Sequence, residues 1–163
     1  MRFRPPKKLK RRGWVRRPDG LNQSEGQVLG ILRSLNLNPV PQVQIGRYTV
    51  DFVLPGQKAV IEVDGEPYHS LPDQSRKATV RDRFLRAEGY LPIHIWTSTL
   101  HREGGRTLVV RHILTRLFQE RGTVLPGHAK FYRKLGYDPD KGAVTPSGLP
   151  AQPPSGKADP TPP

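Results

Sequence analysis

The sequence contains no cysteine, no long apolar run and no apolar segment behind its basic N-terminus. Without cysteine the chain has neither disulfides nor thiol catalysis, which agrees with a reducing compartment. A transmembrane helix needs about 18 or more apolar residues in a row, and none is present. The N-terminus does not have the pattern of a secretory signal. We therefore expect a cytoplasmic protein without a membrane partner.

Apolar residues are also few, at 34 % of the 163 residues, and they concentrate between positions 21 and 125. That segment is long enough for one core, and residues 1–20 read as an irregular basic arm. A basic and aromatic extension covers 126–137, and residues 138–163 hold eight prolines in 26 positions. We predict that this last segment is a disordered tail, either a spacer or a site for a protein partner. The sequence leaves the oligomeric state open.

Positive charge is concentrated in the arm, which holds nine basic residues and one acid. Its net charge of +8 is most of the +13 of the whole chain. This density predicts a polyanion partner, bound largely through counterion release from phosphates. We expect nucleic-acid contacts from the arm and from a later helix, through Lys7, Lys8, Lys10, Arg11, Arg12, Arg16, Arg17, Arg76 and Lys77.

Periodicity predicts a helix followed by a β-hairpin. Asn22 and Glu25 form a capping-box pattern before an apolar helical face. That face is made of Val28, Ile31, Leu32 and Leu35. Strands are expected over 48–54 and 59–64, joined by a turn at Pro55-Gly56, with a short earlier strand near 43–46. Simple alternation would place Asp51 on one face of the first strand, and Tyr48, Val50, Phe52 and Leu54 on the other.

The rest of the foldable segment alternates helix and strand. We predict a helix over 74–88 with Val80, Phe84 and Ala87 facing inward and Gly89 at its C-cap. A strand over 91–96 and a long helix over 106–119 follow. The packing residues of the long helix are Val109, Ile113, Leu117 and Phe118. The order of elements predicts an α/β fold with a central mixed β-sheet flanked by helices.

Three acids lie in the two hairpin strands, where acids are uncommon. If the loop has four residues, Leu54 pairs with Ala59, Asp51 faces Glu62, and Asp64 shares the face of Glu62. Three such carboxylates would repel one another without a cation, and an oxygen cluster of this kind suits Mg²⁺ or Mn²⁺. A three-residue loop would set the acids on a diagonal instead. A solvated sheet face would explain them without a metal.

The residues around the acids resemble the Vsr-like endonuclease-domain family of the PD-(D/E)XK restriction-endonuclease-like superfamily. The resemblance rests on residues 44–52, on 60–65 and on His69. Further matches are Glu25, Asp82-Arg83, Gly89-Tyr90 and Ile95-Trp96. It covers roughly residues 21–120, nearly the whole foldable part of the chain.

This resemblance implies metal-dependent phosphodiester hydrolysis by a restriction-endonuclease-like core. Asp51 and Glu62 would match the metal-binding acids, with Asp64 completing or tuning the site. Glu25 would match the acid that the first helix contributes, a role compatible with capping that helix. His69 would act as general base or orient the scissile phosphate, unless it is an ordinary loop histidine.

Two departures from the family pattern matter. The superfamily's usual lysine, two positions after the second acid, is Asp64 here, which leaves Lys58, Arg76 or Lys77 as candidate cations to assist the water. The mismatch-repair endonuclease that names the group has a structural zinc site built from cysteines. Because this chain has none, neither that site nor T·G mismatch specificity is expected. We interpret the remaining histidines as structural or surface residues: His94, His101, His112 and His128.

The leading hypothesis is a Mg²⁺- or Mn²⁺-dependent endonuclease acting on DNA rather than RNA. The arm would supply backbone binding without sequence choice, because phosphate contacts position a protein but do not specify a sequence. A catalytically inactive nucleic-acid-binding protein of the same fold is a second hypothesis, favoured by the missing lysine. A structural component of a nucleoprotein assembly is a third, and it leaves the acid cluster unexplained.

Overall fold

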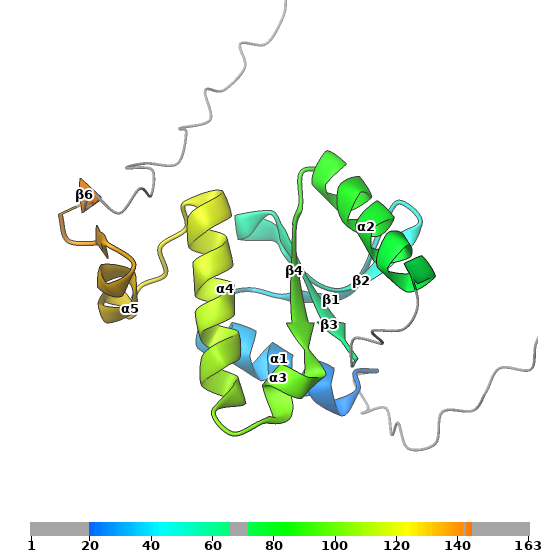
Figure 1. Ribbon diagram of the computed structural model, residues 1–163, viewed down its shortest axis with the longest axis horizontal. Helices are drawn as coiled ribbons and strands as arrows, with labels where there is room; N and C mark the ends of the chain where they lie inside the picture. The colour runs from blue at the N-terminus through cyan, green and yellow to red at the C-terminus, as the bar shows by residue number, and fades with distance from the viewer. Residues whose placement is uncertain (1–19, 66–71, 142, 145–163) are drawn as a thin grey trace, which may run out of the picture.

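A four-stranded mixed sheet forms the centre of the computed structural model, which describes residues 20–65, 72–141 and 143–144 (Figure 1). The strands are β1 (Val40–Ile45), β2 (Tyr48–Leu54), β3 (Ala59–Asp64) and β4 (Leu91–Trp96), in that spatial order. β1, β2 and β3 pair antiparallel, whereas β4 pairs parallel with β3. The predicted α/β class with a mixed sheet is confirmed, and β2, β3 and β4 have the predicted bounds.

Helices cover both faces of this sheet (Figure 1). The helices are α1 (Gln23–Ser34), α2 (Pro72–Ala87), α3 (Thr97–His101), α4 (Gly105–Arg121) and α5 (Ala129–Lys134), of which α5 lies beyond α4, away from the sheet. Residues of α1 and α4 pack with one face of the sheet in the larger core cluster, and a residue of α2 packs with the other face in a smaller one. In the described part of the chain, no helix has the length and apolar character to cross a membrane.

The start of α1 forms as its sequence predicts. The Asn22 side chain accepts a hydrogen bond from the Glu25 backbone N–H at 2.9 Å, and Glu25 Oε2 accepts one from the Asn22 N–H at 2.8 Å. These two bonds satisfy N–H groups that a helix leaves unpaired at its first turn. The predicted apolar face is buried, so α1 is fixed against the sheet with Glu25 at its N-terminal end.

The β2–β3 connection contains four residues, and it sets the register of the acids. A short 3₁₀ turn, η1 (Pro55–Gln57), leads to Lys58, whose φ of 45° lies in the left-handed region. Leu54 therefore pairs with Ala59, and Phe52 pairs with Ile61. The expected register is confirmed. Continued by one position, it sets Asp51 opposite Glu62.

The predicted alternation of side chains along β2 is wrong at one point. Val50 packs in the same cluster as Val53, although simple alternation would put these two residues on opposite faces. The β1–β2 ladder has no pair at Asp51, and Gln42, the residue opposite, has a φ of 52°. The register is the same on both sides of this position, so the irregularity is a local loss of pairing, and it breaks the alternation where the acid lies.

The inward face of α2 also differs from the prediction. Leu85 is fully buried and Phe84 partly buried, whereas Val80 is 48 % exposed and Ala87 is exposed. Phe84 packs against Tyr48 with ring centroids 5.3 Å apart. Val80, Arg83 and Ala87 face solvent, and the half-buried Arg81 and Asp82 are the polar residues that α2 turns toward β3 and β4.

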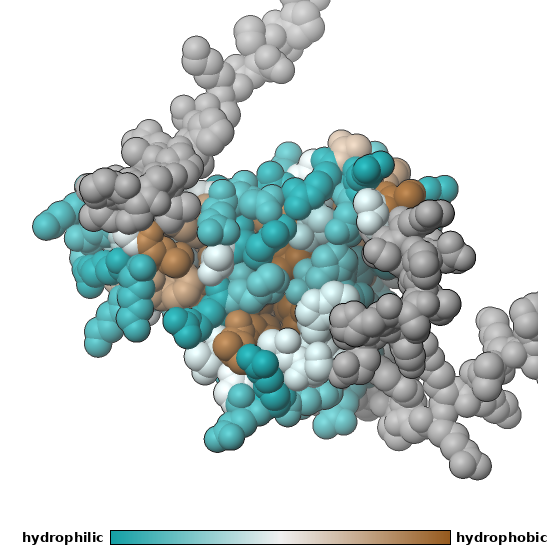
Figure 2. All heavy atoms as spheres, in the orientation of Figure 1, coloured by the Kyte–Doolittle hydropathy of each residue, from teal (hydrophilic) through white to brown (hydrophobic). Residues whose placement is uncertain are grey.

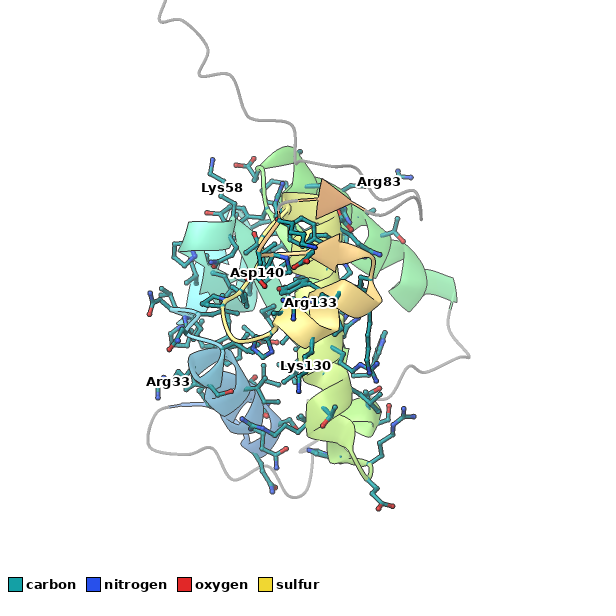
Figure 3. The ribbon with its side chains drawn as sticks, turned by 90° about the vertical axis from the view of Figure 1, so that its left-hand side faces the viewer. Arg33, Lys58, Arg83, Lys130, Arg133 and Asp140 are labelled. Atoms are coloured by element: carbon teal, nitrogen blue, oxygen red, sulfur yellow. The ribbon has the colours of Figure 1, made fainter. Side chains whose placement is uncertain are left out.

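The segment after α4 is built around aromatic packing. Tyr132 of α5 is fully buried against Phe118, and its hydroxyl accepts a hydrogen bond from the Leu125 N–H at 3.0 Å. A short hairpin of β5 (Tyr137–Asp138) and β6 (Ala143–Val144) follows α5. Arg133 of α5 forms ion pairs with Asp138 and Asp140, and these pairs join the helix to the hairpin (Figure 3). The helix and this hairpin are additions to the elements that the sequence predicts.

The described surface is mainly polar. Figure 2 shows hydrophilic side chains over most of the face in view, with apolar side chains in small separate groups. The large hydrophobic residues that are exposed are Val40, Val80 and Trp96. Trp96 ends β4 beside Asp64, its pairing partner in β3, so one of the three lies close to the acids.

Candidate active site

The acids lie together at the end of the sheet where β3 and β4 terminate. Asp51 Oδ2 accepts a hydrogen bond from the Val63 backbone N–H at 2.7 Å, which holds the carboxylate against β3. Glu62 is only 4 % exposed, an unusual burial for a charged residue. The antiparallel register of β2 and β3 and the hydrogen bond to Val63 thus bring Asp51 to the side of Glu62.

A basic residue of α2 contacts the buried acid. Arg81 Nη2 donates to Glu62 Oε1 at 2.6 Å and to the Thr49 carbonyl oxygen at 2.7 Å. The same guanidinium lies over the Tyr48 ring, 5.7 Å from its centroid. Arg81 therefore connects α2 with both β2 and β3 at the centre of the site.

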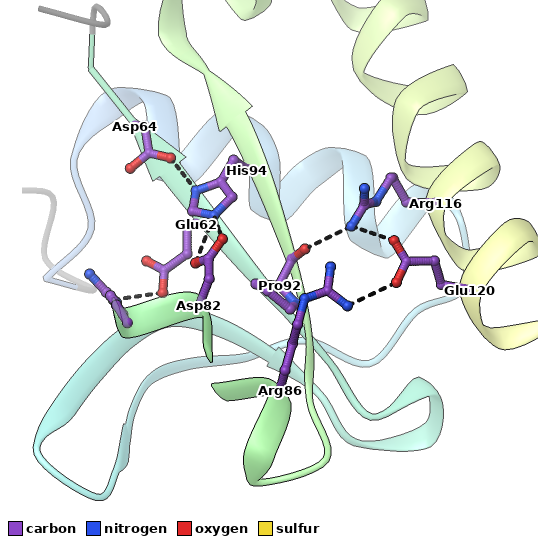
Figure 4. A network of polar contacts seen from close by, with 9 residues as sticks. Glu62, Asp64, Asp82, Arg86, Pro92, His94, Arg116 and Glu120 are labelled. Carbon is purple, nitrogen blue, oxygen red and sulfur yellow. Dashed lines mark hydrogen bonds and ion pairs between the residues drawn. The ribbon is translucent and has the colours of Figure 1, made fainter. Parts of the chain in front are cut away.

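A histidine of β4 joins two further acids, as Figure 4 shows. His94 Nδ1 lies 2.6 Å from Asp64 Oδ2, and its Nε2 lies 3.0 Å from both carboxylate oxygens of Asp82 on α2. The parallel register pairs His94 with Glu62, and Asp64 follows two positions further along β3 on the same face. Carboxylates at both ring nitrogens stabilise the doubly protonated, positively charged ring.

Burial and nearby negative charges raise the pKa values of Asp51 and Glu62. Burial raises the pKa of Glu62 to about 8, against an opposing effect from Arg81 and with further increases from Asp51 and Asp64. Burial also raises the pKa of Asp51, and the charge of Glu25 adds to this increase although Glu25 is engaged in the capping box. For His94 the hydrogen bond to Asp64 is the largest cause of a pKa raised to about 9.

The donor set suits a divalent cation, with one restriction. Asp51 and Glu62 offer carboxylate oxygens on adjacent strands, and a cation would relieve the repulsion that raises both pKa values. In the described residues, however, no group of three or more acids and histidines is arranged to hold a metal ion. The existing ion pairs explain this, because Arg81 is paired with Glu62 and His94 is paired with Asp64. Of the described acids, Asp51 and Glu62 are the two that would hold the ion, and Arg81 is paired with Glu62 in this structure.

Several predicted site residues lie elsewhere or outside the described structure. His69 and the arm residues Lys7, Lys8, Lys10, Arg11, Arg12, Arg16 and Arg17 lie outside the described residues. Arg76 and Lys77 lie on α2, where the structure describes their backbone alone. Lys58 precedes the start of β3, four residues from Glu62 along an extended strand, and projects from the edge of the molecule in Figure 3. It lies too far away to assist a water at the acids.

Arg81, Asp82 and His94 were not assigned to the site by sequence reasoning. Arg81 was one cation among several on a helix that reads as a basic face, and His94 was interpreted as a structural or surface residue. Asp82 suggested a salt bridge with Arg83, but its contact is with His94. The only sequence signal was the alternation of β4, since His94 is a polar residue between apolar neighbours Ile93 and Ile95.

The structure is an α/β domain with acids gathered at one end of a mixed sheet. Residues 25–114, more than half of the chain, match the restriction-endonuclease-like family REase_MTES_1575, and the chain belongs to this family. Among solved structures, the catalytic domain of the homing endonuclease I-Bth0305I is similar over 57 % of this chain and 95 % of that one, at 22 % identity and a TM-score of 0.45. No curated protein matches the sequence. The expected superfamily is confirmed, and the Vsr-like subgroup stays a prediction.

Proposed function

We propose that this protein is a divalent-metal-dependent endonuclease that hydrolyses phosphodiester bonds in DNA. The observation that carries the proposal is the placement of Asp51 beside Glu62, both in strands and both with raised pKa values. Glu62 is buried and Asp51 partly buried, and acids with raised pKa values cluster at functional sites because burying a charge is costly. Membership of a restriction-endonuclease-like family supports the same reaction class.

Each residue of the proposed site would have a separate role. Asp51 and Glu62 would hold Mg²⁺ or Mn²⁺, which when bound polarises the phosphate and lowers the pKa of the attacking water. Asp64 would tune the site through its ion pair with His94, and Glu25 would add negative charge from the start of α1. His69 is proposed as a supporting base. The basic arm would hold the nucleic-acid backbone.

The direct test compares the wild type with Glu62→Gln, which keeps the size and one acceptor oxygen of the side chain. Both proteins are incubated with plasmid, branched and single-stranded DNA and with matching RNA, in Mg²⁺, Mn²⁺ or EDTA. We expect metal-dependent product from the wild type and a loss of about a thousandfold or more in the variant, because metal catalysis supplies several kcal/mol. Asp140→Asn, a change in the β5–β6 turn, is the matched control and should cleave normally.

A nucleic-acid-binding protein without catalysis is the second candidate. The observation that favours it is that Arg81 and His94 already compensate Glu62 and Asp64, so the site is electrostatically satisfied without a metal. This function predicts salt-sensitive DNA binding and no product with any divalent cation. The cleavage assay above therefore separates the two functions directly.

A further inference from the structure

The contact between Arg81 and Glu62 is more than an ordinary surface ion pair. Glu62 is almost fully buried, and one guanidinium nitrogen bridges its carboxylate to the backbone of β2. Charge-assisted hydrogen bonds of this kind are roughly twice as strong as neutral ones. Any cation that binds Glu62 must first overcome this contact.

The guanidinium is nevertheless incompletely satisfied where it lies. Arg81 Nε is shielded from solvent and has no hydrogen-bond partner among the described residues. The side chain as a whole keeps 30 % of its surface exposed, so it has a path toward solvent. An arginine with an unused Nε and an exposed edge can bind two oxygens of a phosphate side by side.

The second cation of the site differs from the first in its freedom to move. His94 is bonded to carboxylates at both ring nitrogens, and it comes from a central position in β4. Arg81 instead has a long flexible side chain on α2, held to one carboxylate and one carbonyl. Of these two cations, Arg81 is the one that can exchange partners.

We propose that Arg81 competes with the divalent cation for Glu62 and that, once displaced, its guanidinium binds a phosphate of the nucleic-acid substrate. This inference rests on the proposed function and deepens it. Arg81 then has two successive partners: the Glu62 carboxylate in the metal-free protein, and the substrate phosphate when the metal is bound. The exchange couples metal binding to substrate binding without any change of fold.

The first experiment measures Mn²⁺ binding by calorimetry, without nucleic acid, for the wild type, Arg81→Gln and Arg81→Lys. Removing a competitor worth about 1.4 kcal/mol strengthens binding about tenfold, so we expect Arg81→Gln to bind Mn²⁺ about tenfold more tightly than the wild type. Arg81→Lys keeps the charge and should bind nearly as the wild type does. Arg81→Met keeps the aliphatic stem and gives the same test if the Gln variant does not fold.

The second experiment measures binding of a short DNA duplex with hydrolysis-resistant phosphorothioate linkages, by fluorescence anisotropy with and without Mn²⁺. We expect Mn²⁺ to strengthen binding by the wild type and this gain to disappear in Arg81→Gln. Arg83→Gln is the matched control, because Arg83 is an exposed arginine two positions along the same helix (Figure 3). It should keep the gain.

The outcomes separate this inference from the proposed function. If neither the wild type nor the variants bind Mn²⁺, the proposed metal site is wrong. If Mn²⁺ binds the wild type and Arg81→Gln equally, or the variant more weakly, the site stands and the competition is wrong. If the Mn²⁺-dependent gain in DNA binding survives in Arg81→Gln, the second role of Arg81 is wrong.

Discussion

The two faces of the sheet are covered in different ways. On one face α1 and α4 close over a continuous apolar cluster that contains Phe52, Ile61 and Ile93. On the other face α2 covers only a small cluster around Val60 and Leu85. Beyond that cluster the same face carries Glu62, Asp64 and His94, so one face serves stability and the other combines a small core with the polar site.

Neighbouring residues of β3 make this difference clear. Ile61 and Glu62 are both buried, but they point to opposite faces because side chains alternate along a strand. Ile61 lies among apolar partners, whereas Glu62 has an arginine and other acids around it. Burial of the first residue stabilises the fold. Burial of the Glu62 carboxylate costs free energy of folding, and we attribute its presence to the function of the site.

The largest expected effect on stability is from Ile61→Ala. The change leaves a cavity in the larger cluster and should lower the free energy of unfolding by about 2–5 kcal/mol. Denaturant unfolding followed by circular dichroism measures this loss. A loss no larger than that of Val60→Ala, on the smaller cluster, would show that the two faces do not differ as described.

Glu62→Gln, measured in EDTA, should instead raise the free energy of unfolding. Because the pKa of Glu62 rises from 4.5 to about 8 on folding, the folded state binds the proton more tightly than the unfolded state does. The stability of the wild type therefore falls as pH rises between these values, by at most about 1.4 kcal/mol per pKa unit of the shift. The variant lacks this cost, so its advantage in unfolding free energy should grow from pH 5 to pH 8. A constant difference across this range would contradict the shifted pKa.

A smaller effect is expected from Gly46→Ala, in the β1–β2 turn that packs on α2. Gly46 has a φ of 55°, and an added Cβ would lie 2.4 Å from Phe84 Cζ. The Phe84 ring would have to move from its contact with Tyr48, at a cost of about 1–3 kcal/mol. Thermal unfolding measures the loss. Gly56→Ala, where a Cβ meets no atom within 4 Å, is the matched control and should change stability little.

Much of the fold could be predicted because its signals are local. The capping box at Asn22 and Glu25 and the bounds of β2, β3 and β4 follow from residue types and spacing within a few positions. The outward turn of Val80 could not be predicted, because the apolar pattern of α2 is weak and its orientation depends on Tyr48 and Leu85. The break in the alternation at Asp51 could not be predicted either, because the Asp51 side chain is hydrogen-bonded to the backbone of another strand.

The sequence by itself determined the class of the fold, the bounds of β2, β3 and β4, and the concentration of positive charge in the arm. Periodicity and composition carry that information, and both can be counted along the chain. The choice between a loop of four residues and one of three, and with it the register of the acids, came from the structure. Only the tertiary structure decided which cations form ion pairs with the acids. Arg81 reaches Glu62 across 19 positions and His94 reaches Asp64 across 30. Such contacts depend on how α2 and β4 pack against β3, and no local pattern encodes that packing.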